Sequence, residues 1–442
     1  MAVIPSACLL FILLNLLLGV NIARSEPFLG VNYGQLADNL PSPSDTVKLL
    51  QSTSIQKIRL YGPNIPLIKA LANTGIEIVV GAANGEIPAL ASDPNAARAW
   101  ITTNVVPYYP ASDIILIMVG NEISTDDNLR KQLLPAMQNM QNALNSVALD
   151  AKIRISTVHS MAVLGMSEPP SKGSFRAGLV DAMKGFLGFN NATGSPFAIN
   201  PYPYFAYKSD NRPETLAFCL FQPNAGRYDP YTKIRYMNMF DAQVDAVRSA
   251  LNSLGYNNVD IVVAETGWPY KGDDKEVGPS YDNAKAYNGG LIFHLRSKAG
   301  SPLMQGKSVD TYLFALYDEN LKPGASSERA FGLFKPDGTA TYDVGLLKSS
   351  QGQGSNGEWC VPKAGVTDVQ LQANLDYACG KGGIDCGPIQ PGGACFEPNT
   401  LLSHATYAMN LLYQTNGKHA WDCDFSKTAT LSSKNPSYNG CT

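Results

Sequence analysis

The stretch from Ile114 to Glu122 reads IILIMVGNE, and its pattern recurs along most of the chain. A run of apolar residues leads into Gly120, Asn121 and Glu122. Short, continuously apolar runs are typical of strands that are covered on both faces, as in a parallel sheet. We therefore predict a buried strand here, with Asn121 and Glu122 at its carboxyl end.

Seven other segments repeat this pattern, and stretches with helical spacing separate them, most clearly residues 129–147, 237–254 and 284–298. Parallel neighbours need such crossovers, and eight units in ~320 residues predict a closed (β/α)8 barrel, an α/β fold. An open doubly wound sheet is the alternative, but neither G-x-G-x-x-G nor a Walker A sequence is present. The other predicted strands are Phe28–Gly34, Ile55–Gly62, Ile76–Ala82, Ile153–His159, Phe197–Tyr202, Val259–Thr266 and Thr311–Tyr317.

The composition narrows the class of protein. The chain has 442 residues, 45% of them hydrophobic, and a net charge of −3, which indicates a folded globular protein. Charged residues make up only 16%. Without basic clusters, nucleic acid is not expected as a partner. Low charge together with 21 Tyr and 16 Phe favours a neutral, polyhydroxylated ligand.

Two segments divide the chain. Residues 7–20, ACLLFILLNLLLGV, are too short for the ~20 residues that span a bilayer. They predict a secretory signal peptide over residues 1–25, and no later stretch predicts a transmembrane segment. Residues 349–358 are polar and rich in Gly and Ser, which is typical of a flexible linker. The linker would separate a body, residues 26–348, from a tail, residues 359–442.

The cysteines concentrate in the tail. Six of the eight fall between residues 360 and 441, and an even set in a small secreted domain indicates a disulfide framework. Their spacings are wider than those of a zinc site. Cys219 stands alone, and we expect a buried thiol. Asn191 begins an Asn-Ala-Thr sequon, so we expect N-glycosylation there, on a surface loop.

Three glutamates follow apolar runs at predicted strand ends: Glu122, Glu265 and Glu319. In a barrel these ends share the face that carries the active site. Two carboxylates in a dry cleft separate their pKa values, so that one stays protonated while the other stays ionised. Glycoside hydrolysis needs such a pair, about 5–5.5 Å apart for retention and about 6.5–9.5 Å for inversion. A solvated or salt-bridged role is the alternative for each glutamate taken alone.

Other chemistries find little support. The four histidines show no metal-ligand spacing, and no G-x-S-x-G sequence is present. We therefore expect neither a metal nor a cofactor. Aromatic rings are flat and amphipathic, so those near the strand ends are candidates for stacking on sugars, although some will be core residues. They are Tyr33, Tyr61, Tyr202, Tyr204 and Trp268.

Ordered sequence blocks add a resemblance to a known family. The blocks are Gly30–Gly34 (GVNYG), Ile58–Gly62 (IRLYG), Val119–Glu122 (VGNE), Asn200–Tyr207 (NPYPYFAY), Val263–Pro269 (VAETGWP), Phe314–Asn320 (FALYDEN) and Phe331–Phe334 (FGLF). On these blocks, residues 27–347 resemble plant glycoside hydrolase family 17, the glucan endo-1,3-β-glucosidases.

The resemblance implies a barrel and a retaining double displacement without a cofactor. Glu122 would be the general acid/base, and Glu265 would be the nucleophile. Asn121 would hold the sugar 2-hydroxyl, and Tyr202 would orient the nucleophile. The remaining implied contacts to the substrate or to the cleft are Tyr61, Trp268, Glu319, Lys322 and Glu328.

The tail resembles the cysteine-rich carbohydrate-binding module of family 43, on the blocks Trp359–Cys360, Leu375–Cys379, Ile384–Cys386 and Gly393–Phe396. The resemblance implies binding of β-1,3-glucan. A spacer or a protease-resistant cap is the alternative. The implied disulfides are Cys360–Cys423, Cys379–Cys386 and Cys395–Cys441.

The combined expectation is a secreted, monomeric endo-hydrolase of (1→3)-β-D-glucosidic linkages in β-1,3-glucan, such as callose or laminarin-like polymers. It would act in the extracellular space or cell wall, for example in plant defence. One alternative is a catalytically silent wall protein that binds glucan. Another is a transglycosylase, in which a sugar hydroxyl resolves the glycosyl-enzyme. The presence of both Glu122 and Glu265 favours an enzyme.

Overall fold

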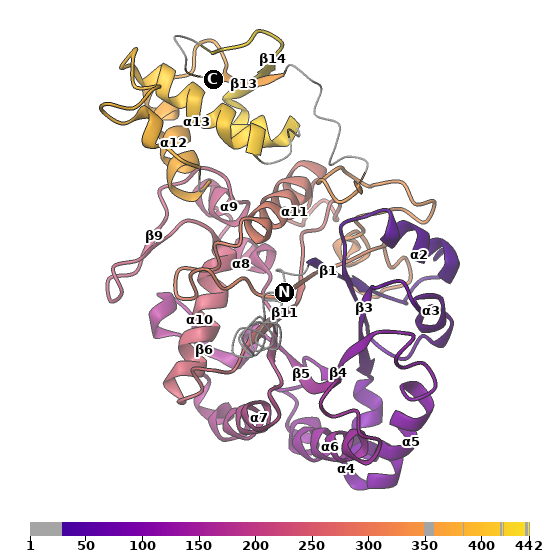
Figure 1. The fold of residues 1–442 in the computed structure, drawn as a ribbon. Coiled ribbons are helices and arrows are strands. Elements are labelled where there is room, and N and C mark those ends of the chain that lie inside the picture. The colour runs from indigo at the N-terminus through magenta and orange to yellow at the C-terminus, as the bar shows by residue number, and fades with distance from the viewer. Residues whose placement is uncertain are drawn as a thin grey trace, which may run out of the picture.

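The computed structural model describes residues 29–348, 358–382, 384–415, 418, 420–437 and 441. The signal peptide expected over residues 1–25 lies outside the described residues, as does all of the expected linker except its last residue. The described chain forms a barrel and a small C-terminal domain, which Figure 1 shows in yellow above the barrel.

Eight parallel strands close into the barrel, in the order β1-β12-β11-β8-β5-β4-β3-β2. Every strand lies within or beside a segment that the sequence predicts, so the barrel is confirmed and the open sheet is excluded. The strands are β1 (Leu29–Tyr33), β2 (Lys57–Leu60), β3 (Glu77–Ala82), β4 (Ile114–Asn121), β5 (Arg154–Ser160), β8 (Phe197–Asn200), β11 (Ile261–Thr266) and β12 (Thr311–Leu313).

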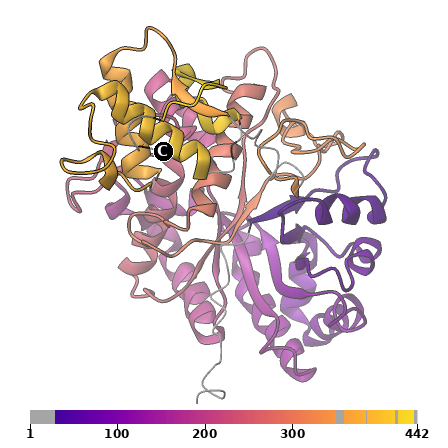
Figure 2. The same cartoon turned by 45° about the horizontal axis from the view of Figure 1, so that its top comes forward.

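Helices surround the strands, as Figures 1 and 2 show from two directions. The three clearest predicted helices are present as α6 (Asp127–Ser146), α10 (Met239–Ser253) and α11 (Tyr281–Arg296). Each begins after an Asp, Asn or Ser whose side chain accepts a backbone N–H of the first turn, a strong N-cap. The other barrel helices are α2 (Pro43–Gln51), α3 (Ile65–Ala70), α4 (Ile87–Ser92), α5 (Pro94–Asn104), α7 (Val180–Thr193), α8 (Pro203–Ser209) and α9 (Pro213–Cys219).

Side chains fill the inside of the barrel. Along β4, Leu116 and Met118 belong to a buried cluster with Val262 and Tyr312, whereas Ile117 and Val119 belong to the larger core that includes the helices. This alternation follows from the two-residue period of a strand. Because the interior is packed, ligands have access only at an end of the barrel.

Within residues 29–348, two short antiparallel pairs accompany the barrel strands. β6 (Leu164–Met166) pairs with β7 (Ser174–Phe175), and β9 (Arg227–Tyr228) pairs with β10 (Arg235–Tyr236). Both pairs follow the carboxyl ends of barrel strands, β5 and β8 respectively. They therefore build up the face on which a barrel carries its active site.

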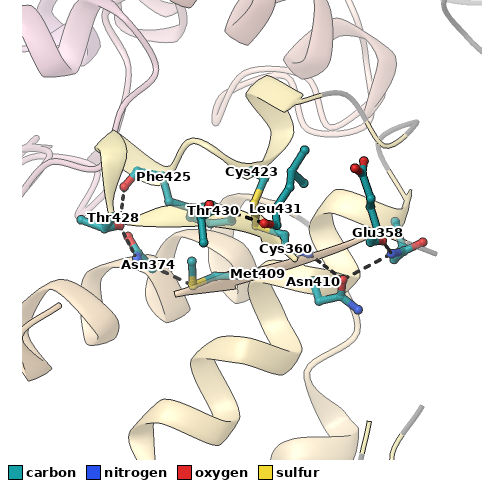
Figure 3. The surroundings of a disulfide bond; sticks show 11 residues. Glu358, Cys360, Asn374, Met409, Asn410, Cys423, Phe425, Thr428, Thr430 and Leu431 are labelled. Atoms are coloured by element: carbon teal, nitrogen blue, oxygen red, sulfur yellow. Dashed lines mark hydrogen bonds between the residues drawn. A yellow bond between two sulfur atoms is a disulfide. The ribbon is translucent and has the colours of Figure 1, made fainter. Parts of the chain in front are cut away.

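The C-terminal domain contains β13 (Trp359–Pro362), β14 (Ala429–Ser432), α12 (Asp368–Asp376) and α13 (Leu401–Thr415). Its core is small, and the three disulfides add the constraint that such a core needs. Figure 3 shows the Cys360–Cys423 bond beside Met409, with Asn374 Nδ2 donating to Thr428 Oγ1 at 2.8 Å. The disulfides are Cys360–Cys423, Cys379–Cys386 and Cys395–Cys441, the pairing that the resemblance implies.

The two units touch through α11, where Phe293 packs against the core of the C-terminal domain (Figure 1). Cys219, at the end of α9, is a buried free thiol, and burial raises its pKa to about 12. Asn191 is exposed but lies in the last turn of α7, so the surface loop expected for it is wrong. Within the described ranges, no helix combines the length and apolar character needed to cross a membrane.

Candidate active site

Glu122 and Glu265 line one cavity of about 490 Å³ at the carboxyl end of the barrel. Glu265 lies in β11, and Glu122 follows directly after β4. In the barrel, β8 and β5 lie between β11 and β4. The two carboxyl groups that the sequence singles out therefore share one hollow, open at the face where barrel enzymes bind substrate.

Glu265 is 7% exposed, and its carboxylate receives a hydrogen bond on each oxygen. Arg59 Nη1 donates to Oε1 at 2.8 Å, and the Tyr202 hydroxyl donates to Oε2 at 2.9 Å. A carboxylate held from both sides has one fixed orientation, and it is paired with a buried positive charge. The contact from Tyr202 is the one that the resemblance implies.

Arg59 is a residue of this site that the sequence analysis quoted but gave no role. It lies in β2, is 2% exposed, and donates to Asn32 Oδ1 at 3.0 Å and to Asn121 Oδ1 at 2.7 Å. A single guanidinium thus connects Glu265 with the residue before Glu122. The available signal was a charged residue between the apolar Ile58 and Leu60 of a buried strand, since a buried arginine requires partners.

Glu122 occupies a sharp turn at the end of β4. Its φ is +58° and that of Gly120 is +72°, so the backbone adopts a left-handed conformation on either side of Asn121, the last residue of β4. Asn84 fixes this turn, because its side chain bonds the N–H of Asn121 at 2.7 Å and the carbonyl at 3.1 Å. Asn200 Nδ2 donates to Glu122 Oε1 at 2.7 Å.

The two glutamates differ in their surroundings. Burial raises the pKa of Glu122, and the negative charge of Glu265 raises it further. The hydrogen bond from Asn200 and the charges of Arg59 and Lys322 oppose this rise without cancelling it. Glu122 therefore favours the protonated form more than a solvated glutamate does, while Glu265 is bound to a cation.

The supporting residues divide into two groups. Lys322 and Glu328 line the cavity and form an ion pair at 3.1 Å, with the Lys322 ammonium 4.5 Å from the Phe314 ring. Glu319 does not line the cavity; it accepts the N–H of Leu36 and lies against Gly34. A Cβ at residue 34 would lie 2.0 Å from the Glu319 carboxyl carbon, so a side chain there would displace the Glu319 carboxylate.

Tyr61 and Asn121 lie beside the carboxylates. The Tyr61 hydroxyl donates to Asn32 Oδ1 at 3.3 Å, and the Arg59 guanidinium lies 4.5 Å from its ring centroid. Asn121 Oδ1 is occupied by Arg59, which leaves the amide Nδ2 as the group with hydrogen atoms to donate to a ligand.

Trp268 is not a sugar contact in this structure. Its side chain is fully buried, packs on Tyr204 and Tyr287, and donates from Nε1 to the carbonyl of Gly278 at 2.9 Å. A sugar ring cannot stack on a side chain that has no exposed surface, so Trp268 supports the site from within the core. Phe205 is 46% exposed and lines the cavity, although sequence analysis did not single it out.

Tyr33 and Tyr204 are also buried, so they belong to the core. His159 is likewise buried, and desolvation lowers its pKa to about 3, which keeps it neutral. Across the part of the chain that the structure describes, no group of three or more His, Cys, Asp or Glu side chains is arranged to hold a metal ion.

The chain is similar to known families and proteins. Residues 29–346 match the model of glycosyl hydrolases family 17, and residues 358–430 match the X8 domain. Glucan endo-1,3-beta-glucosidase 7 of Arabidopsis thaliana is 67% identical over 95% of this chain and 84% of its own length. Glucan endo-1,3-beta-D-glucosidase of Olea europaea is 61% identical over 99% of this chain and 98% of its own.

The barrel also resembles solved structures. CJP38, a beta-1,3-glucanase and allergen of Cryptomeria japonica pollen, is 43% identical, with a TM-score of 0.69 over 73% of this chain and 99% of its own. Three findings therefore indicate the same family. A family model covers most of the chain, the relatives are this similar along nearly their whole length, and the barrel carries paired glutamates at its carboxyl end. The chain belongs to glycosyl hydrolases family 17 and carries a C-terminal X8 domain.

Proposed function

We propose that the chain is a retaining glucan endo-1,3-β-glucosidase in which Glu122 is the general acid/base and Glu265 is the nucleophile. The observation that carries this proposal is the asymmetry of two glutamates in one cavity. Burial raises the pKa of Glu122, whereas Glu265 is held by Arg59 and Tyr202. The relatives named above, glucan endo-1,3-β-glucosidases, support the choice of linkage.

In the first step, the Glu122 carboxyl donates its proton to the glycosidic oxygen while a Glu265 oxygen attacks the anomeric carbon. The bond from that carbon to the leaving oxygen breaks, and a glycosyl ester with Glu265 forms. In the second step, ionised Glu122 removes a proton from water, whose oxygen displaces Glu265. Glu122 regains its proton, and the product keeps the configuration of the substrate.

Neighbouring residues would assist these steps. Asn121 Nδ2 is placed to donate to the sugar 2-hydroxyl, because Arg59 holds the other end of that amide. Tyr202 and Arg59 fix the two oxygens of Glu265. Lys322 and Glu328 would complete the walls of the site, with Tyr61, Glu319 and Trp268 supporting them from outside the cavity lining.

The C-terminal domain would hold the enzyme on its polymer. A glucan-binding module next to the barrel raises the local concentration of the active site on insoluble β-1,3-glucan. The match to the X8 domain supports this role. We also propose a secreted, glycosylated monomer that acts at the cell wall. The apolar N-terminal segment and the disulfides support secretion, and the exposed Asn191 sequon supports glycosylation.

Product analysis on linear β-1,3-gluco-oligosaccharides tests the proposal. We expect internal cleavage and products with the β-anomeric configuration at first, as followed by proton NMR. Products that start in the α-configuration would exclude retention. Longer products than the starting material would favour transglycosylation, and no product at all would favour a silent glucan-binding barrel.

The role of Glu265 is tested with Glu265→Gln, which keeps the shape and removes the negative charge. We expect turnover to fall below detection while binding of oligosaccharide remains measurable by calorimetry. Glu214→Gln, at an exposed helix start, is the matched control and is expected to leave turnover unchanged. Normal turnover in Glu265→Gln would assign the nucleophile to another residue.

A further inference from the structure

A second hollow of about 590 Å³ adjoins the catalytic cavity. We call it the hairpin groove, because the segment from Met161 to Pro170 lines one part of it and the β9–β10 hairpin lines another. Met161, Ala206 and Gln243 line both hollows, so the two share a boundary. In Figure 1, β9 projects from the barrel on the same side as α10 and β6.

Two tyrosines of the hairpin line this groove and expose large ring surfaces. Tyr228 is 49% exposed and Tyr231 is 63% exposed. A cation accompanies each ring: Lys172 Nζ lies 4.0 Å from the Tyr231 centroid, and the Arg235 guanidinium lies 5.6 Å from the Tyr228 centroid. Such cation–π contacts restrict the rings without covering them completely.

The turn that carries Tyr231 is fixed by a buried carboxylate, Asp229, which has no exposed surface. Asp229 accepts the N–H groups of Tyr231 and Thr232 at 3.0 and 3.4 Å. It also accepts the N–H and the hydroxyl of Ser171, both at 2.9 Å, from the segment that faces the hairpin. The aromatic platform is therefore organised before any ligand arrives, which reduces the entropy lost on binding.

The polar groups of the groove suit a neutral ligand with many hydroxyls. Arg227 Nη2 donates to Thr215 Oγ1 at 2.9 Å, and its guanidinium lies between Glu168 at 3.4 Å and Asp210 at 3.5 Å. One guanidinium and two carboxylates are the charged groups that line the groove, so the groove does not select an anion. A sugar-binding site needs aromatic rings that stack on the flat face of a pyranose and charged groups that form hydrogen bonds with its hydroxyls.

We propose that the hairpin groove binds distal glucosyl units of the same β-1,3-glucan chain that occupies the catalytic cavity. The proposal rests on the function proposed above and extends it. A chain that passes Met161, Ala206 and Gln243 leaves the catalytic cavity and enters the groove. Each added unit that reaches Tyr228 and Tyr231 then strengthens binding, so the enzyme prefers long chains.

The test removes both rings from the full-length chain with the double variant Tyr228→Ala/Tyr231→Ala. We expect kcat/KM to fall about tenfold on long soluble β-1,3-gluco-oligosaccharides, a change of about 1.4 kcal/mol. We expect no change on the shortest oligosaccharide that is cleaved. Tyr281→Ala is the matched control, because Tyr281 is 51% exposed and lines neither hollow.

An equal loss on all chain lengths, or no loss on any, would overturn the proposal. The single variants Tyr228→Ser and Tyr231→Ser, each checked by its melting temperature, repeat the test if the double variant does not fold. Calorimetric binding of long oligosaccharides to Glu265→Gln, with and without the tyrosines, is a separate arm. If the tyrosines strengthen binding but the unmodified protein cleaves no β-1,3-glucan, the proposed function is refuted and the proposed binding role of the groove stands.

Discussion

Arg59 Nη1 lies 2.8 Å from Glu265 Oε1, and the same guanidinium lies 2.7 Å from Asn121 Oδ1 through Nη2. One buried cation thus connects the strand that carries Glu265, the proposed nucleophile, with the turn that carries Glu122, the proposed acid. A lysine has a single ammonium on a flexible chain and does not reproduce this planar fork. We therefore expect Arg59 to act as a positioning residue for both steps of the proposed reaction.

For Arg59→Lys we predict a fall in kcat of about 100-fold on β-1,3-gluco-oligosaccharides, with little change in KM. The reason is that Glu265 and Asn121 lose their common partner while the sugar subsites remain. Arg248→Lys is the matched control, because Arg248 is also buried and bonds only backbone carbonyls before β11. We expect it to lower the melting temperature and to leave kcat unchanged. The same kcat in both variants would contradict the positioning role.

The second prediction concerns the pH profile of kcat/KM. The amide of Asn200 donates to Glu122 and so stabilises its ionised form, which opposes the rise in its pKa. Removing the donor with Asn200→Leu raises the pKa of Glu122 further. Because Glu122 must be protonated in the first step, the alkaline limb of the profile is expected to move to higher pH.

Lys322→Met provides an independent check of the direction in which the alkaline limb moves. The ammonium of Lys322 also lowers the pKa of Glu122, but it is the smallest of the causes and is shared with Glu328. The alkaline limb is therefore expected to move in the same direction by a smaller amount. A shift to lower pH in either variant would show that Glu122 is not the acid that controls this limb.

The barrel could be predicted from the sequence because the buried strands are short segments rich in apolar or β-branched residues, and several of them end in polar residues, as IILIMVGNE does. The same rule located Glu122 and Glu265, since strand ends converge on one face. The rule did not predict the orientation of Trp268. A position just after a strand does not show whether a loop side chain points to the cavity or to the core, and the Trp268 ring is buried in the core. Arg59 was missed because its partners lie on β1, β4 and β11, far apart in sequence.

The third prediction concerns the X8 domain. Deleting residues 359–442 removes the module but leaves the barrel core, which is built from residues of the barrel itself. We expect the truncated chain to keep its kcat/KM on soluble oligosaccharides and to be retained less on insoluble β-1,3-glucan in a pull-down. The full-length Glu265→Gln variant is the control for retention without hydrolysis. Equal retention of the long and short chains would assign the module a role other than binding.

The last prediction concerns stability. Asp245 of α10 is fully buried and accepts hydrogen bonds from the Ser301 hydroxyl, the Leu303 N–H and the Tyr236 hydroxyl. Burial raises its pKa to about 7, and the nearby Asp241 adds to the rise. In the unfolded chain the pKa of an aspartate is about 3.9. Folding therefore stabilises the protonated form of this group.

The sign of the effect follows from this difference. The stabilisation is complete below about pH 4 and is lost as the pH rises to about 7, at roughly 1.4 kcal/mol per pH unit. Asp245→Asn stays neutral throughout, so its free energy of unfolding in urea should fall less between pH 5 and pH 7.5 than that of the unmodified chain. The exposed Asp181→Asn serves as the control and should keep the original dependence. If Asp245→Asn follows the same pH curve as the unmodified chain, Asp245 is ionised in the fold and its three donors compensate the buried charge.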